Sequence, residues 1–525
     1  MRKENSIKNI SVGIFSQVII AILGFISRKV FLDNLSITYL GVNGLLTNVL
    51  SLLGLLEAGI GSSIVYNLYK PLAENDKPKV TALIQLYKKA YRILAIVILI
   101  LSIALYPLIK GMMTDGESIT DLTMVYSIFV LKNVFAYLYS HKWCIINADQ
   151  KNYILTRINL KFNIIITISK IVILMLTKNY VLFLLVEMIL TICQSLYSSK
   201  IVDRMYPYIN TAKTYKLDKD TTCKINKNVQ ALFLHNIGTF CVSGTDNLLI
   251  SKFINVAAVG IYSNYSMIIG QLVNIISPIL NGLGASIGNL IATESKEKNY
   301  TIFKVTYLVN FWIYSLCVIF LFNLINPFIE WWIGSQYLLD TFTLTIILLN
   351  CYLTGLRNSI GTFKNKAGIF VQDKYFPLIE SAVNLISSII LVKYLGLVGI
   401  FLGTTISTLS TVFWNVPRLT YRYVFNKPVI KYFTTYFLYL VLTLITGVIT
   451  TGLCRIFADI GGFAGLILKG IICLILPNVI YTLLFFNTKE FQYLFNIAKK
   501  MFNRFNLAKL RGVARVILKR GCYGK

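Results

Sequence analysis

The chain has 525 residues, of which 56% are hydrophobic and 14% are charged, and its formal net charge is +29 at pH 7. Soluble globular proteins are about one-quarter charged, so this composition excludes an ordinary soluble enzyme or binding module. The basic residues are dispersed over many loops between apolar segments, which argues against a nucleic-acid-binding protein.

Apolar runs of roughly 20 residues recur along the chain, and each is long enough to cross the hydrocarbon core of a bilayer. Because lipid offers no partners to backbone polar groups, these runs should form helices. We therefore predict an all-α integral membrane protein with about 14 transmembrane helices. The predicted spans are, in chain order, 10–31, 40–66, 86–109, 121–141, 153–176, 178–199, 229–252, 259–291, 303–325, 337–356, 376–393, 397–417, 431–454 and 463–486.

The charges of the connecting loops predict how these helices are oriented. If the N-terminus is cytoplasmic, each predicted inner loop is rich in Lys and Arg, as is the C-terminal tail. The predicted outer loops carry few basic residues, namely Lys110, Lys178, Lys252, Lys393 and Arg455. This asymmetry is the positive-inside rule, and it predicts that both termini are cytoplasmic. The inner basic residues are also expected to contact anionic membrane lipids.

Two parts of the chain carry the same pattern. The sequence GIGSSI at 59–64 recurs as GLGASI at 282–287, and residues 9–41 align without a gap with residues 228–260. Many transporters are built from such a duplicated membrane unit, with the substrate path between the two halves. The repeat therefore indicates a transporter.

The glycines of the repeated motif are Gly59, Gly61, Gly282 and Gly284. We expect them to allow close packing and bending of helices rather than to bind a ligand, because small residues let helices approach each other.

The repeat and the loop charges together predict five segments. They are an N-lobe at 1–201, a basic cytoplasmic linker at 202–228, a C-lobe at 229–420, two further helices at 421–486, and a basic amphipathic tail at 487–525 on the inner leaflet.

Arg28 and Lys29 lie late in the first span, toward its predicted outer end. They could snorkel to the outer headgroups. Alternatively, they could bind an anionic substrate, which we favour because a basic pair at an outer end departs from the positive-inside pattern. The planar fork of arginine suits phosphate, because it can donate two parallel hydrogen bonds.

Asp246 and Asn247 align in the repeat with Ser27 and Arg28. One half would then present an acid where the other presents a cation, and an Arg28–Asp246 pair that breaks when substrate enters would form a gate. The alternative is a structural acid near a helix end, bonded to Thr245 or Asn264.

Other polar residues lie within predicted spans, where a charge tends to face protein or a water-filled cavity. Glu57 could line the cavity or take up a coupling proton, or it could be a buried acid that holds a lysine. Lys132, in the middle of the fourth span, is a candidate cavity residue. The weaker candidates are Glu187, His235 and Glu380, while Lys170 and Lys469 could snorkel to an interface.

No cofactor is predicted. The nine cysteines are scattered without a CxxC pair, there are only two histidines, and no GxxxxGK[ST] motif is present. These features indicate neither a metal site nor a nucleotide site. Uphill transport would then draw on an ion gradient, the membrane potential or the chemistry of the substrate.

The sequences DNLLI at 246–250 and VGIYS at 259–263, with YLG at 39–41 and EAGIG at 57–61, resemble the polysaccharide and lipid-linked oligosaccharide flippases. These belong to the multidrug/oligosaccharidyl-lipid/polysaccharide exporter (MOP) superfamily. The resemblance implies two six-helix lobes around a central cavity, plus two C-terminal helices.

The same resemblance implies a function. An undecaprenyl-diphosphate-linked oligosaccharide would move from the inner to the outer leaflet of a bacterial cytoplasmic membrane by alternating access. Relatives that flip the peptidoglycan precursor use cavity arginines on the first helix, and Arg28 is the matching position. Because a fuller arginine set is missing, a surface-polysaccharide or teichoic-type unit is the predicted cargo. The protein would be a monomer and not an enzyme, with other polysaccharide-assembly proteins as further candidate partners.

Three alternatives remain at this point. A drug or metabolite exporter of the same superfamily usually has twelve spans and an acidic cavity. A membrane glycosyltransferase or polymerase would need a sizeable acidic outer loop, whereas the first outer loop, near 33–38, is short. A structural scaffold would not need the intramembrane residues Arg28, Lys132 and Asp246.

Overall fold

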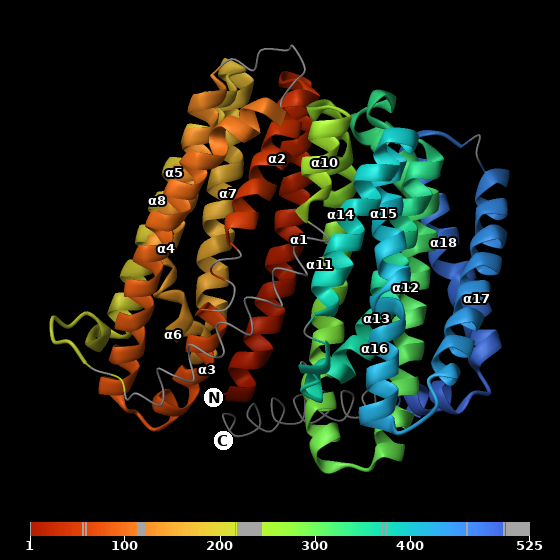
Figure 1. The fold of residues 1–525 in the computed structure, drawn as a ribbon. Helices are drawn as coiled ribbons and strands as arrows, with labels where there is room; N and C mark the ends of the chain where they lie inside the picture. The colour runs from red at the N-terminus through yellow and green to blue at the C-terminus, as the bar shows by residue number, and fades with distance from the viewer. Residues whose placement is uncertain are drawn as a thin grey trace, which may run out of the picture. The chain divides into compact units, whose positions relative to one another are not determined.

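The computed structural model describes residues 2–54, 57, 60–112, 121–215, 217, 244–369, 371–373, 375–457, 460–496 and 499. Over these residues the chain is almost entirely helical, and this part of it contains no β-strand (Figure 1). The α-helices are α1 (Arg2–Asn34), α2 (Ile37–Leu53), α3 (Ile60–Ala73), α4 (Lys77–Met112), α5 (Leu122–Ser140), α6 (Trp143–Ala148), α7 (Asn152–Thr177), α8 (Tyr180–Met205), α10 (Asp246–Phe253), α11 (Val256–Thr293), α12 (Lys296–Ile333), α13 (Thr341–Lys366), α14 (Phe376–Leu395), α15 (Leu397–Ser410), α16 (Val412–Thr420), α17 (Ile430–Ile456) and α18 (Gly462–Phe485). Short 3₁₀ turns lie at Pro207–Ile209, Ser335–Tyr337 and Val371–Asp373, and a π-helical turn lies at Tyr421–Phe425.

The predicted all-α membrane fold is confirmed. Among the described residues, eleven helical segments are long and apolar enough to cross a membrane, and each coincides with a predicted span. The predicted span at 337–356 corresponds to α13, and the span at 40–66 to α2 and α3. Of the predicted span at 229–252, the structure describes only residues 244–252, which include nearly all of α10.

Two predicted spans are interrupted. Helix α2 ends at Leu53 with Gly54 as its C-cap, and α3 begins at Ile60. Near 411 the backbone of Thr411 (φ −122°, ψ −88°) separates α15 from α16. Hydrophobicity continues across both breaks, so an apolar-run criterion predicts a single span in each case.

The chain forms two compact units. One comprises Met1–Asn281, Ile325–Asn350 and Asp373–Trp414, and the other comprises Gly282–Leu324, Cys351–Gln372 and Asn415–Lys525. The first unit contains α1 to α8, α10, α14 and α15, together with the Val256–Asn281 part of α11 and the parts of α12, α13 and α16 that fall within its ranges. The predicted lobe boundaries at 201 and 229 stay predictions.

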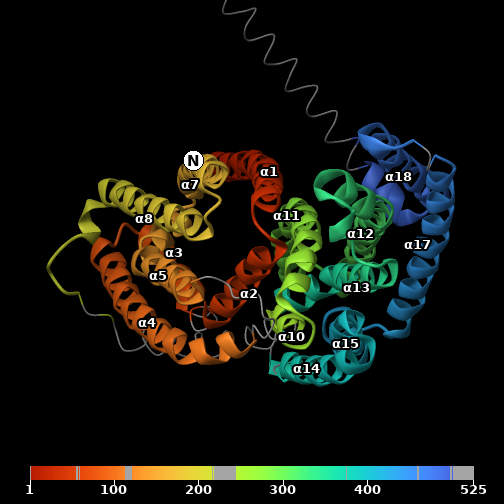
Figure 2. The same cartoon turned by 90° about the horizontal axis from the view of Figure 1, so that it is seen from above.

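Within the first unit, α1 packs on α7, α7 on α8, α8 on α5, and α5 on α4 (Figures 1 and 2). Helix α2 packs against α10, and α14 lies along α15. A large apolar cluster includes Leu45 and Leu46 of α2, Val125 of α5 and Leu184 of α8, all of them buried. This core holds α1, α2, α7 and α8 in place, and these helices build the site described below.

Stacked aromatic rings form much of the core of the second unit. Tyr307 of α12 stacks on Phe303 and on Tyr432 of α17, with ring centroids 5.4 and 5.3 Å apart. Phe311 stacks on Tyr439 at 4.1 Å. Such contacts add to the free energy of burial and fix α12 against α17.

A reciprocal helix contact supports the internal repeat. A Cβ atom at Gly41 would lie 1.9 Å from the Val256 carbonyl oxygen, and one at Gly260 would lie 2.5 Å from the Ile37 carbonyl oxygen. In the repeat alignment Gly41 corresponds to Gly260 and Ile37 to Val256. Equivalent residues of α2 and α11 therefore meet across a local two-fold relation, where only glycine permits the approach.

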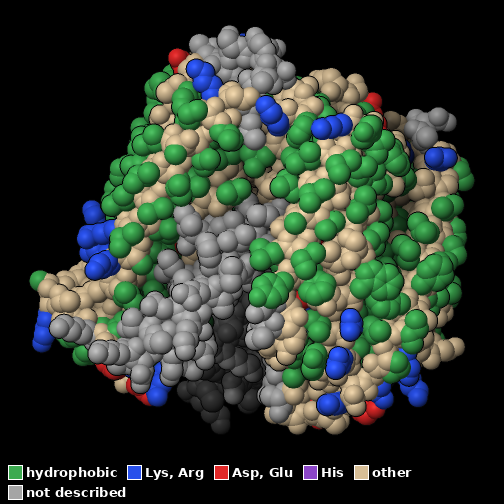
Figure 3. Space-filling model, in the orientation of Figure 1, with side chains coloured by type: hydrophobic (Ala, Val, Ile, Leu, Met, Phe, Trp, Pro, Cys, Tyr) green, Lys and Arg blue, Asp and Glu red, His purple; other side chains and the backbone are tan. Residues whose placement is uncertain are grey.

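The outward faces of the helices are apolar. Large hydrophobic side chains such as Leu176 of α7, Val448 of α17 and Leu483 of α18 are more than two-thirds exposed, at 79, 72 and 75%. Figure 3 shows hydrophobic side chains along the helices, with Lys and Arg mainly toward their ends. So much exposed apolar surface suits contact with lipid and not with water.

Candidate functional site

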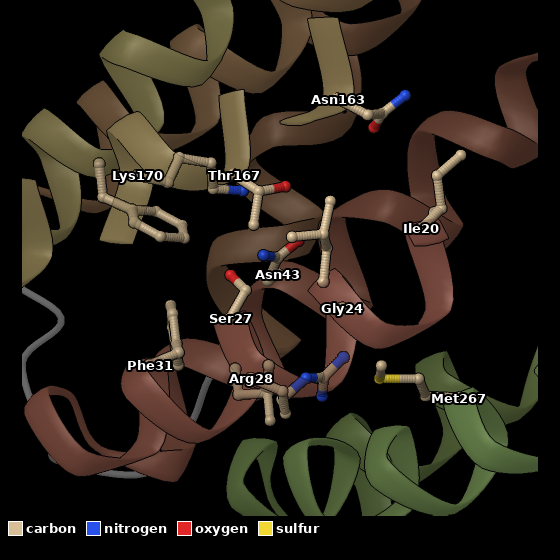
Figure 4. A pocket seen from close by; sticks show the side chains of 13 residues that line it. Ile20, Gly24, Ser27, Arg28, Phe31, Asn43, Asn163, Thr167, Lys170 and Met267 are labelled. Atoms are coloured by element: carbon tan, nitrogen blue, oxygen red, sulfur yellow. The ribbon is translucent and has the colours of Figure 1, made fainter. Parts of the chain in front are cut away.

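A cavity of about 250 Å³ lies in the first unit, between α1, α2, α7, α8 and α11 (Figure 4). Two of its lining side chains are cationic, Arg28 and Lys170, and no described residue that lines it is acidic. In Figure 4, Ser27, Asn43 and Thr167 lie between these two cations. The full lining consists of Ile20, Leu23, Gly24, Ser27, Arg28, Phe31, Leu40, Asn43, Asn163, Thr167, Lys170, Phe183 and Met267. An apolar wall with a few polar groups and excess positive charge suits an anionic group attached to a lipid.

Arg28 reaches the cavity from α1 and bonds to α11. Its Nη1 donates to Ser263 Oγ at 2.8 Å and to Asn264 Oδ1 at 3.1 Å. Both acceptors are neutral, so these bonds orient the guanidinium without cancelling its charge. A half-buried cation held in this way attracts an anion strongly, because charge-assisted hydrogen bonds are about twice as strong as neutral ones.

The predicted Arg28–Asp246 pair is absent from the part of the chain that the structure describes. Arg28 bonds Ser263 and Asn264 instead, and Asp246 Oδ1 is buried without a hydrogen-bond partner among the described residues. Equal depth in two helices does not, however, bring two side chains together.

Asn247 is the residue that the repeat alignment pairs with Arg28. Nδ2 of Asn247 lies 3.7 Å from the position of a Cβ atom built on Gly44 of α2. Asn247 is buried, and its Oδ1 has no hydrogen-bond partner among the described residues.

Lys29 points away from the cavity. Its Nζ donates to the Trp332 carbonyl at 2.8 Å, and Trp332 Nε1 donates to the Phe25 carbonyl at 3.2 Å. Successive residues of an α-helix point about 100° apart, so neighbours such as Arg28 and Lys29 rarely share one site. The cation of Lys29 lies at the C-terminal end of α12, where the helix dipole favours positive charge.

Lys132 also does not line the cavity, but it belongs to a charge cluster that reaches it. Lys132 Nζ of α5 donates to Glu187 Oε1 of α8 at 2.8 Å. Lys170 of α7 donates to the other carboxylate oxygen of Glu187. Lys170 also lies 4.2 Å from the centroid of the Phe183 ring, which is a cation–π contact within the cavity wall.

The sequence did carry a signal for Lys170. Helices α7 and α8 are joined at Lys178 and Asn179, and Lys170 and Glu187 are equally far from this turn. Residues equidistant from a tight turn lie at the same depth in a helical hairpin, so opposite charges at such positions are candidates for a pair. Taken alone, Lys170 could snorkel to an interface, but in the structure it pairs with Glu187.

Glu57 lies in a cluster of tyrosines. Tyr91 donates to Glu57 Oε1, and Tyr87 donates to Tyr91 at 2.7 Å. Its described partners are therefore hydroxyl groups and not the lysine of the structural alternative. A Cβ atom at Gly61 would lie 2.9 Å from Tyr87 Oη, so Gly61 provides room for this cluster.

The remaining predicted residues add little to the site. Gly59 and His235 lie outside the described residues. Gly282 and Gly284 lie within α11, and Glu380 is buried on α14. Among the described residues, no group of three or more His, Cys, Asp or Glu side chains could hold a metal ion.

Comparisons with known proteins give matches only at the level of structure. No protein-family model and no curated protein sequence matches the chain. The structure is similar to that of the lipid II flippase MurJ in an inward closed conformation, with a TM-score of 0.65 and 14% identity over 90% of this chain and 98% of that one. It is similar to an inward-facing multidrug resistance MATE family transporter of the MOP superfamily, with a TM-score of 0.56 and 15% identity over 76% of this chain and 95% of that one.

A third similar structure is a MOP superfamily transporter from Pyrococcus furiosus, described as having a binding pocket of reverse polarity. Its TM-score is 0.55, with 14% identity over 81% of this chain and 97% of that one. The chain therefore has the fold of MOP superfamily transporters, as the sequence resemblance implied.

Proposed function

We propose that this protein is a flippase that moves an undecaprenyl-diphosphate-linked oligosaccharide from the inner to the outer leaflet by alternating access. The cargo would be a surface-polysaccharide or teichoic-type unit, and the membrane would be the bacterial cytoplasmic membrane. Both termini would be cytoplasmic, in accordance with the loop charges. The transporter fold supports a carrier and not a glycosyltransferase.

The observation that carries the proposal is the polarity of the cavity. Arg28 and Lys170 line it, and its described lining contains no carboxylate. A cationic drug would meet repulsion there, whereas a diphosphate would meet two donors of charge-assisted hydrogen bonds. The same polarity disfavours the drug-exporter alternative, for which an acidic cavity was expected.

The size of the cavity limits which part of the cargo it holds. Its volume of about 250 Å³ lies near the lower end of small-molecule sites, which occupy about 300–1,000 Å³. It suits the diphosphate with the first atoms of its substituents. The remaining glycan and the isoprenyl chain would extend beyond it, and the apolar residues Phe31, Leu40 and Met267 would contact the start of the lipid.

Binding can be coupled to movement through Arg28. Its present acceptors, Ser263 and Asn264, lie on α11 in the second half of the repeat, whereas Arg28 lies on α1 in the first. Phosphate oxygens would compete for the same Nη1 donor and replace two neutral acceptors by anionic ones. This exchange would remove the two hydrogen bonds through which Arg28 holds α1 to α11 and so favour their separation. A ligand that binds the released state more tightly shifts the population toward it, as alternating access requires.

Asp246 is the proposed coupling residue. Its buried Oδ1 has no described partner, so an ionised carboxylate is costly in this position. Binding of a proton or a cation would remove that cost. Glu57, bonded to Tyr91, is the second candidate for this role. Gly59, Gly61, Gly282 and Gly284 are proposed to allow bending of their helices.

The test is translocation in liposomes. The wild-type protein would be reconstituted with a fluorescent undecaprenyl-diphosphate oligosaccharide, and an impermeant quencher would report which leaflet holds the label. We expect protein-dependent exchange between leaflets, and loss of at least about 90% of the rate in Arg28→Ala, which corresponds to about 1.4 kcal/mol or more. Arg455→Ala, the same change at an exposed residue near the predicted outer end of α17, is the matched control.

Two results would contradict the proposal. Absence of exchange with the wild-type protein, together with elongation or transfer of the glycan, would favour the glycosyltransferase alternative. Equal rates for Arg28→Ala and Arg455→Ala would remove Arg28 from the substrate path.

A further inference from the structure

One carboxylate holds two lysines beside the cavity. Glu187 of α8 accepts from Lys132 of α5 at 2.8 Å and from Lys170 of α7 through its second oxygen. Their side chains are only 20, 23 and 17% exposed, respectively. The cluster is therefore largely withdrawn from solvent and carries one positive charge in excess.

The position of the cluster relates it to Arg28. Lys170 and Glu187 each lie about two helical turns from the turn that joins α7 to α8, and Arg28 lies about two turns from the end of α1. Lys170 and Arg28 line the same cavity, whereas Lys132 lies behind Glu187 and does not line it. The excess charge of the cluster is thus presented to the cavity through Lys170.

We propose that Lys170 is a second phosphate-binding residue and that Glu187 and Lys132 position and charge it, so that the cavity selects a doubly charged diphosphate over a singly charged phosphate. This inference rests on the proposed function, because it concerns the same cavity. A diphosphate that links a lipid to a sugar carries two negative charges. Arg28 and the excess charge of the cluster together supply two positive ones.

Each member of the cluster has a separate part in this selection. Lys170 has three donor hydrogens, of which one serves Glu187 and others remain for phosphate oxygens. Glu187 prevents the lysine from snorkelling to the outer interface and fixes its ammonium group at the cavity wall. Lys132 compensates the charge of Glu187, which would otherwise repel the ligand and neutralise Lys170.

A purely structural cluster makes a different prediction. Paired charges within a membrane stabilise the bundle whether or not a ligand binds. In that case changes at Lys132 or Lys170 would alter stability and leave the choice between ligands unchanged. Ligand preference therefore separates the two accounts, and a change in stability alone does not.

The experiment measures binding to the purified full-length protein in detergent. The probes are an isoprenyl-diphosphate N-acetylglucosamine and the matching isoprenyl-phosphate N-acetylglucosamine, which differ by one phosphate and one charge. We expect the wild-type protein to prefer the diphosphate. Lys170→Met should lower diphosphate affinity by about tenfold or more and change monophosphate affinity by less than about threefold. Arg28→Ala should weaken binding of both probes, and Lys161→Met, an exposed lysine on the same helix, should leave both unchanged.

Substitution of Lys132, which bonds Glu187 from outside the cavity lining, best distinguishes the inference from a purely structural role. Lys132→Met leaves a neutral Lys170–Glu187 pair, so it should lower diphosphate affinity by about tenfold although Lys132 does not line the cavity. The double variant Lys132→Met with Glu187→Gln restores the excess charge and should recover most of that affinity. These variants also keep the inference testable if Lys170→Met does not fold.

The outcomes distinguish the inference from the function. If Arg28→Ala weakens binding while Lys170→Met and Lys132→Met leave the diphosphate preference intact, the inference is overturned and the proposed function stands. The inference also fails if the double variant binds no better than Lys132→Met. If the wild-type protein binds neither probe, the proposed function itself is overturned.

Discussion

The helix crossing at Gly41 and Gly260 gives a prediction that depends on geometry alone. Replacing Gly41 with alanine places a methyl group 1.9 Å from the Val256 carbonyl oxygen, and replacing Gly260 places one 2.5 Å from the Ile37 carbonyl oxygen. Both contacts are to backbone atoms, which a rotamer change does not move. Helices α2 and α11 must therefore separate by about 1 Å, and packing along the crossing is lost on both sides.

The expected cost follows from overpacking. Forced insertion of a methylene into a packed interior costs about 1–3 kcal/mol, and contact with backbone places these substitutions at or above the upper part of that range. The intrinsic helix preference of alanine over glycine offsets about 1 kcal/mol. We expect a net destabilisation of about 2 kcal/mol for Gly41→Ala, and less for Gly260→Ala, whose nearest contact is longer. The double variant Gly41→Ala with Gly260→Ala should be destabilised by less than the sum of the two single variants, because both substitutions open the same helix crossing.

The assay is the thermal unfolding midpoint of the purified protein in detergent. Gly270→Ala is the matched control, because Gly270 lies on α11 as well and a Cβ atom there would meet nothing within 4 Å. The control should be neutral or slightly stabilising, while Gly41→Ala unfolds at a clearly lower temperature. Equal midpoints for Gly41→Ala and Gly270→Ala would refute the close crossing, and with it the structural support for the repeat.

Three further substitutions test individual contacts. Lys29→Met removes one hydrogen bond to the Trp332 carbonyl, so it should lower the free energy of unfolding by about 1 kcal/mol and leave most transport intact. A loss of transport as large as that of Arg28→Ala would place Lys29 in the substrate path. Asp246→Asn removes a carboxylate whose Oδ1 has no described partner, so thermal unfolding should show unchanged or slightly raised stability, while the flipping rate in liposomes should fall. A normal flipping rate would show that Asp246 is not a coupling residue. Glu57→Gln weakens the acceptor of the Tyr91 hydroxyl, so it should lower the free energy of unfolding by about 1–2 kcal/mol and leave diphosphate binding unchanged. Weaker diphosphate binding would show that Glu57 belongs to the binding site.

The sequence predicted the spans well because hydrophobic length is a local property. Within the described part of the chain, the eleven segments that could span a membrane all coincide with predicted ones. It did not predict the break between α2 and α3, because Gly54 and Glu57 lie inside a continuous apolar run. Helix interruption depends on packing and on local caps, which hydropathy does not measure.

The site was only partly predictable. Arg28 was identified from its depth and its outer position, and it lines the cavity. The outer position also predicts Lys29, and depth within the fourth span predicts Lys132, yet rotation about the helix axis directs them to Trp332 and Glu187. Depth along a helix can be read from a sequence, whereas direction depends on which helices become neighbours. The pair of Lys170 and Glu187 is predictable from the sequence, because both helices of that hairpin and its short turn are predicted.

The measurement that tests the central claim most directly is the movement of a lipid-linked diphosphate oligosaccharide across a bilayer by the wild-type protein and by Arg28→Ala. The account predicts rapid, protein-dependent exchange of the label for the wild type and for Arg455→Ala, and little exchange for a folded Arg28→Ala. Unchanged exchange in Arg28→Ala, or none with the wild type, would contradict it.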